Sequence, residues 1–65
     1  MRVQTQDGLI NASNETLRNI AIAYAESANR YDNLGLTALA KRNREVFCEI
    51  SVALGVGKEN KQWLN

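Results

Sequence analysis

Two stretches of this sequence repeat apolar residues at helical spacing, and one short linker joins them. The first stretch follows Ser13, a residue type that favours the N-cap, and carries Glu15 near the positive end of the helix dipole. Its apolar residues recur at three- and four-residue steps, at Leu17, Ile20, Ala21, Tyr24, Ala28 and Tyr31. The pattern predicts a helix over 14–33, ended by Asp32, Asn33 and Gly35.

The second stretch predicts a helix over 37–54, which Gly55 and Gly57 close. Polar residues Lys41, Arg42, Glu45 and Glu49 lie opposite its apolar arc, which comprises Leu36, Leu39, Ala40, Val46, Phe47, Ile50, Ala53 and Leu54. A linker this short places the two helices next to each other and antiparallel. The predicted fold is therefore mainly α, an antiparallel αα-hairpin.

Residues 1–12 differ from the rest and predict a β arm. Arg2 to Gln6 alternate polar and β-branched residues, and Leu9-Ile10 resume apolar character after Asp7-Gly8, a pair typical of a type I′ turn. This arrangement indicates a short N-terminal β-strand or hairpin. Because an isolated two-stranded ribbon is marginal in water, it lies against the helices, pairs with a second copy, or frays.

We expect the chain to form a single domain over 1–65, in which residues 58–65 are a short tail. It adds one short C-terminal helical turn that folds Trp63 and Leu64 back onto the open end of the hairpin. The alternative is that this tail contacts another protein.

The small size of the chain points to a protein partner. A domain of 65 residues buries about 60% of its unfolded surface, so its core supplies at most ~3–5 kcal/mol. The single cysteine, Cys48, cannot form an intramolecular disulfide. Without histidine the usual Cys/His zinc sets are absent, and we predict no metal and no cofactor. We expect a homodimer or larger assembly, arranged as a dimeric helical bundle.

The predicted oligomer interface is on the second helix, because neither helix can cover the whole apolar arc of the other. Asn43 falls in the middle of the apolar stripe, where it either pairs with its symmetry mate and fixes register or is hydrated near the end of the hairpin. Tyr24 and Tyr31 pack from the first helix. The interface prediction comprises Leu39, Asn43, Phe47, Ile50 and Leu54.

Charge and hydropathy exclude several function classes. A net charge of +1 disfavours indiscriminate binding to polyanions. No apolar run has the length of a signal peptide or a membrane span, so we expect a cytoplasmic protein without membrane contact.

Catalytic residues are also hard to find. Cys48 has no histidine that could act as its general base. Glu45 and Glu49 are expected to form a solvated ion-pair face with Lys41 and Arg42. We predict that the protein is not an enzyme. The expected function is a non-catalytic protein–protein interaction module, a small self-associating adaptor, inhibitor or regulator.

An alternative function follows from the order of the predicted elements. A polar and β-branched strand followed by two helices resembles the ribbon-helix-helix repressors, and Gly35-Leu36-Thr37 resembles the turn between their helices. The resemblance implies that two chains pair their strands into a ribbon that enters the major groove of DNA. Val3 and Thr5 then face the dimer core, and Arg2, Gln4 and Gln6 contact base edges.

Overall fold

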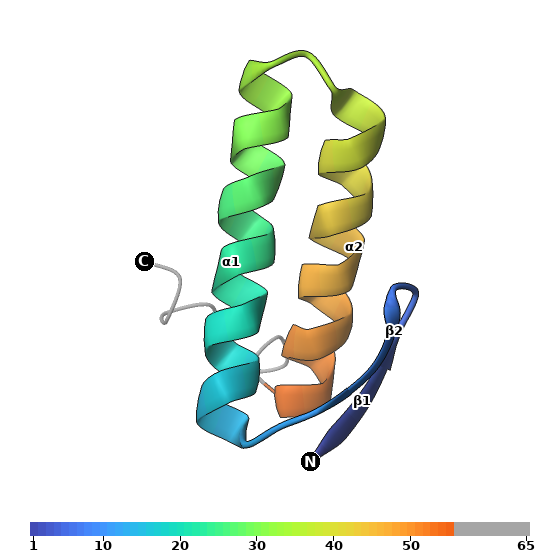
Figure 1. Cartoon of the computed structure of the whole chain (residues 1–65), viewed down its shortest axis with the longest axis vertical. Helices are drawn as coiled ribbons and strands as arrows, with labels where there is room; N and C mark the ends of the chain where they lie inside the picture. The colour runs from blue at the N-terminus through green and yellow to red at the C-terminus, as the bar shows by residue number, and fades with distance from the viewer. Residues whose placement is uncertain (56–65) are drawn as a thin grey trace.

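The computed structural model describes residues 1–55, which form two strands and two helices. In chain order these are β1 (Arg2–Thr5), β2 (Gly8–Asn11), α1 (Asn14–Asn33) and α2 (Thr37–Leu54). The helices run antiparallel side by side, and the β-hairpin lies against their lower half (Figure 1). The predicted αα-hairpin with an N-terminal β-hairpin is confirmed. The predicted helical turn over 58–65 lies outside the described residues.

Local side-chain and backbone bonds define both ends of α1. The hydroxyl of Ser13, the N-cap, accepts a hydrogen bond from the Thr16 N–H at 3.2 Å. At the other end Gly35 is left-handed with φ 79°, the Gly35 N–H donates to the Asp32 carbonyl, and the Leu36 N–H donates to the Tyr31 carbonyl. These two bonds form a Schellman motif, so the predicted stop at Gly35 is confirmed.

The two ends of α2 differ from each other. Its N-cap is Leu36, which provides no side-chain cap, and the first turn contains no acidic residue. Its C-cap is Gly55 at φ 80°, whose N–H donates to carbonyls of the last turn. The predicted helix end at Gly55 is confirmed.

The β-hairpin is paired in regular antiparallel register, from Arg2 opposite Asn11 to Thr5 opposite Gly8. The predicted type I′ turn at Asp7-Gly8 is wrong, because Gln6 and Asp7 form the connection and neither has a positive φ. Gly8, at φ 127°, begins β2 instead. The Thr5 side chain fixes this turn: its Oγ1 accepts from the Asp7 N–H at 3.1 Å and donates to the Gly8 carbonyl at 2.8 Å.

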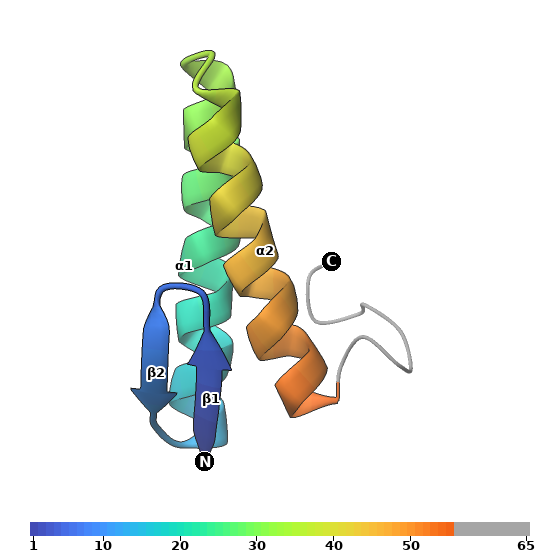
Figure 2. The same cartoon turned by 90° about the vertical axis from the view of Figure 1, so that its right-hand side faces the viewer.

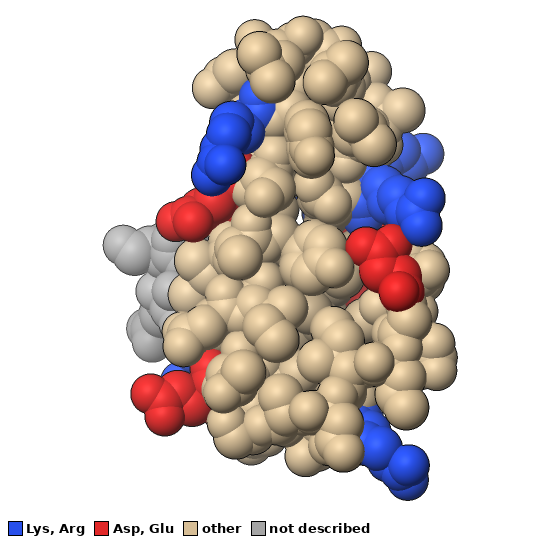
Figure 3. Space-filling model, in the orientation of Figure 1, with Lys and Arg blue, Asp and Glu red and all other residues tan. Residues whose placement is uncertain are grey.

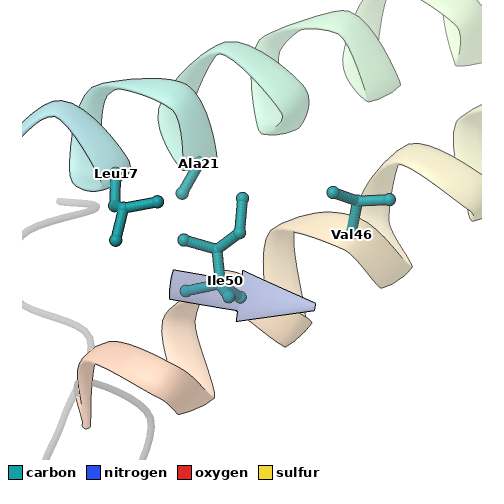
Figure 4. Packing of buried hydrophobic residues seen from close by; sticks show 5 residues of the cluster. Leu17, Ala21, Val46 and Ile50 are labelled. Atoms are coloured by element: carbon teal, nitrogen blue, oxygen red, sulfur yellow. The ribbon is translucent and has the colours of Figure 1, made fainter. Parts of the chain in front are cut away.

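The core joins both helices and β1. Leu17 and Ala21 of α1 point toward α2, from which Val46 and Ile50 point back (Figure 4), and Val3 of β1 completes the cluster. All five are at most 4% exposed. Thr5, also on the inner face of β1, is equally buried, whereas its neighbours in sequence are exposed. Val3 and Thr5, which the ribbon-helix-helix resemblance directs toward a dimer core, are therefore buried inside the single chain.

Of the helices within residues 1–55, neither combines the length and the apolar character that crossing a lipid bilayer requires.

Candidate functional site

The turn of the β-hairpin is tied to both helices through one carboxylate, that of Asp7. The Tyr24 hydroxyl on α1 donates to Asp7 Oδ2 at 3.2 Å, and Arg42 Nε on α2 donates to Asp7 Oδ1 at 3.1 Å. A second guanidinium nitrogen of Arg42 lies 2.9 Å from the same oxygen. The sequence pattern predicts that Arg42 forms an ion-pair face with Glu45 and Glu49 on its own helix. This prediction is wrong for Arg42, which pairs with Asp7 of the hairpin turn. The pairing with Asp7 spans 35 residues of sequence, which helical spacing alone cannot indicate.

The contacts of Tyr24 alter its acidity. Burial against the core is the main reason that the pKa of the Tyr24 phenol lies above its ordinary value of 10.0. The hydrogen bond to Asp7 and the negative charge of Asp7 raise this pKa further, and the charge of Arg42 partly opposes them. Tyr24 therefore stays a neutral donor that holds the hairpin turn against α1.

The predicted DNA-contacting residues lie on the hairpin in two different environments. Arg2 and Gln4 are exposed on its outer face. Gln6 is also exposed, but it bonds to α2: its backbone N–H donates to Glu49 Oε1 and its Nε2 donates to Glu45 Oε1, each at 3.0 Å. β1 pairs with β2 of the same chain. Gln6 contacts two carboxylates of α2 and does not lie on an open ribbon face.

The predicted interface residues differ in their exposure to solvent. Ile50 is fully buried in the core of the single chain, and Phe47 and Leu54 are half-buried against that core. Leu39 is 47% exposed, the largest exposure of the predicted set. Asn43 is half-buried, at the side of a hollow between the helices.

The apex of the helical hairpin exposes three leucines. Leu34 is 68% exposed, Leu36 is 45% exposed and Leu39 is 47% exposed, around the connection between α1 and α2. The Schellman motif causes this arrangement, because it reverses the chain at Gly35 with a leucine on each side. No charged residue occurs from 33 to 40, and the top of the molecule is free of charged side chains in Figure 3. We call Leu34, Leu36 and Leu39 the apical patch.

A basic region borders the apical patch. Residues 30–44 carry four basic side chains and one acidic one, whereas the rest of the described chain carries two basic and five acidic side chains. Arg42 pairs with Asp7 and Arg44 pairs with Asp32. Within residues 1–55, Arg30 and Lys41 have no such partner, so the surface next to the apical patch has excess positive charge.

Two neighbouring hollows lie along α1 between its middle and Leu34. One, of about 280 Å³, is lined by Ile20, Ala23, Tyr24, Ser27, Tyr31 and Asn43. The other, of about 100 Å³, is lined by Ser27, Arg30, Tyr31 and Leu34. The β-hairpin lies against the lower half of the helices (Figure 2), and its turn reaches the larger hollow through the bond from Tyr24 to Asp7.

Residues 1–55 contain no group of three or more His, Cys, Asp or Glu side chains placed to hold a metal ion. Cys48 is an exposed free thiol. It lies beside an open depression lined by charged residues of α2, where Lys41 and Glu45 also lie.

Comparison with known proteins finds no family model that matches the chain, and no curated protein or solved structure that is similar to it.

Proposed function

We propose that this protein is a non-catalytic protein–protein interaction module, a small self-associating adaptor, inhibitor or regulator. The observation that carries the proposal is the apical patch, in which three large apolar side chains are about half exposed or more at the tip of the helical hairpin. Isolated exposed leucines are ordinary, but a charge-free group of them at one end of a small domain is typical of a contact surface.

The charges around the apical patch indicate the chemistry of the partner. Arg30 lines a hollow together with Leu34, and Lys41 follows Leu39 by two residues on α2. Neither has an ion-pair partner in the described part of the chain. An apolar groove with an acidic rim complements this combination: the groove buries the leucines and the rim meets the basic side chains. Apolar anchors provide most of the affinity in such contacts, and rim charges mainly raise the association rate.

Affinity capture tests the apical contact with matched variants. The double variant Leu34→Ser/Leu39→Ser removes most of the apical patch, and Val52→Ser is its control because Val52 is 64% exposed on α2, away from the apex. We expect a partner retained by the native chain and by Val52→Ser to bind the double variant at least about tenfold more weakly. Equal capture by all three chains would show that the apical patch is not the contact surface.

The DNA-binding alternative has one observation in its favour. Val3 and Thr5 are buried while Arg2 and Gln4 are exposed, which is the alternation that a DNA-reading strand needs. The carboxylates of Glu45 and Glu49 beside the hairpin oppose it, because they would repel phosphate groups.

Selection from random duplexes at a stated salt concentration tests this alternative. Enrichment of one sequence by the native chain, lost on alanine substitution of Arg2, Gln4 and Gln6 together, would support DNA binding. Failure to enrich any sequence removes it.

A further inference from the structure

The outer edge of β2 presents backbone groups that the hairpin does not use. Met1 and Ala12 exchange both backbone bonds: the Ala12 N–H donates to the Met1 carbonyl at 3.0 Å, and the Met1 nitrogen donates to the Ala12 carbonyl at 3.1 Å. Bonded and non-bonded pairs alternate in an antiparallel ladder. The register therefore makes Val3/Ile10 a bonded pair, and leaves Leu9 and Asn11 of β2 with N–H and C=O groups that point away from β1.

These four groups of Leu9 and Asn11 have no hydrogen-bond partner within residues 1–55. Figure 2 shows β1 between β2 and α2, so β2 is the outer strand. Natural edge strands are blunted by charged side chains, proline or a bulge. β2 has the sequence Gly-Leu-Ile-Asn and none of these features, and Leu9 is 57% exposed.

We propose that the edge of β2 is the binding site for a second copy of this chain, whose β2 pairs with it in antiparallel register. The inference rests on the self-association in the proposed function and names the surface that carries it. The product is a four-stranded sheet in the order β1-β2-β2-β1, with all four helices on one face.

The spacing of the free backbone groups on β2 matches the same groups of a second β2, which favours a second copy of this chain as the partner. If Ile10 lies opposite Ile10 of the second copy, Leu9 lies opposite Asn11 of that copy, and Asn11 lies opposite its Leu9. Each of these two outer pairs is then a bonded pair that exchanges both backbone bonds. All the free N–H and C=O groups of Leu9 and Asn11 are satisfied in both copies, by one two-fold axis perpendicular to the sheet.

The side chains near this edge also fit a two-fold contact. Ile10 is half-buried on the core side of the sheet, so its pairing with a second Ile10 extends the apolar core of both copies. Ile20 packs on the same core. The face of α1 that contains Ile20 continues with Thr16, Ala23 and Ser27, which are small or uncharged. No charged side chain on that face between residues 16 and 27 opposes the approach of a second α1.

Amide hydrogen exchange measured across about a hundredfold range of protein concentration tests the inference, together with sedimentation velocity. We expect the exchange of the Leu9 and Asn11 amides to slow as the dimer forms, while the Ile10 amide is protected at every concentration. In a mixture of isotope-labelled and unlabelled chains, a contact between the Ile10 Hα atoms of two copies reports the register.

A chemical variant separates the edge from other surfaces. A methyl group on the Leu9 amide nitrogen removes an outward donor and leaves the bonds inside the hairpin intact. The control is a methyl group on the Thr37 nitrogen, the first residue of α2, where a missing donor is tolerated. We expect the dissociation constant of the dimer to rise at least about tenfold for the first chain and to be unchanged for the second.

Leu9→Lys provides a second route to the same result, since a charge on the edge strand hinders pairing while the hairpin keeps its register. A dimer in which Leu9 and Asn11 exchange at a concentration-independent rate overturns the edge assignment and leaves self-association standing. A chain that stays monomeric throughout, or that protects this edge only with an added unrelated peptide, overturns the pairing of two copies. The apical contact is judged separately, because Leu34→Ser/Leu39→Ser leaves β2 unchanged.

Discussion

Ile50 is the residue at which truncation measures the core most directly. It is fully buried, and it contacts the cluster formed by both helices and β1. Ile50→Ala removes three carbon atoms, a loss of ~2.5 kcal/mol in transfer free energy at ~0.8 kcal/mol for each. The cavity left behind raises the total to ~3–4 kcal/mol, because the surrounding residues collapse only partly. Since a core of this size supplies ~3–5 kcal/mol, Ile50→Ala is expected to be largely unfolded at low protein concentration.

Urea unfolding followed by circular dichroism tests this expectation, with two further variants that fix the scale. Ile50→Val removes one carbon atom and is expected to lower the free energy of unfolding by ~1 kcal/mol, with an unchanged dependence on urea. Val52→Ala changes a side chain that is 64% exposed, so its effect is expected within ~0.5 kcal/mol. If Ile50→Ala costs no more than Val52→Ala at the same protein concentration, the assignment of Ile50 to the core is wrong.

Three further predictions concern the hairpin turn, β2 and the hollow between the helices. The pKa of Tyr24 in the folded chain exceeds the unfolded value of 10.0, so the raised pKa adds its full contribution to the free energy of unfolding below pH 10.0. That contribution is lost as pH rises through the folded pKa. Asp7→Asn should lower the folded pKa of Tyr24, which phenolate absorbance measures. An unchanged titration of Tyr24 in Asp7→Asn would contradict the contact. Gly8→Ala should cost ~1–3 kcal/mol through strain alone, since φ is 127° and no atom lies within 4 Å of an added Cβ; a native melting temperature would refute this. Asn43→Leu should raise stability and broaden the distribution of oligomers if Asn43 specifies register, and sedimentation of a single unchanged species with unchanged stability would remove that role.

The helix boundaries could be predicted from sequence because short-range bonds determine them. The Ser13 hydroxyl caps α1 three residues away, and Gly35 and Gly55 end the two helices in left-handed conformations that other residues adopt only with strain. The observed limits, Asn14–Asn33 and Thr37–Leu54, match the predicted 14–33 and 37–54. The inward direction of Val3 also followed from a local rule, since alternate residues of a strand face opposite sides.

The tertiary structure decided which members of the apolar stripe are available for contact. Leu39 and Ile50 belong to one stripe of α2, yet Leu39 is 47% exposed and Ile50 is fully buried. The reason is that the β-hairpin covers only the lower half of the helices, where Val3 completes the core around Ile50. The same packing brings Asp7 to Tyr24 and Arg42. Such contacts join residues far apart in the chain, so periodicity and turn propensity, which report neighbours in sequence, contain no information about them.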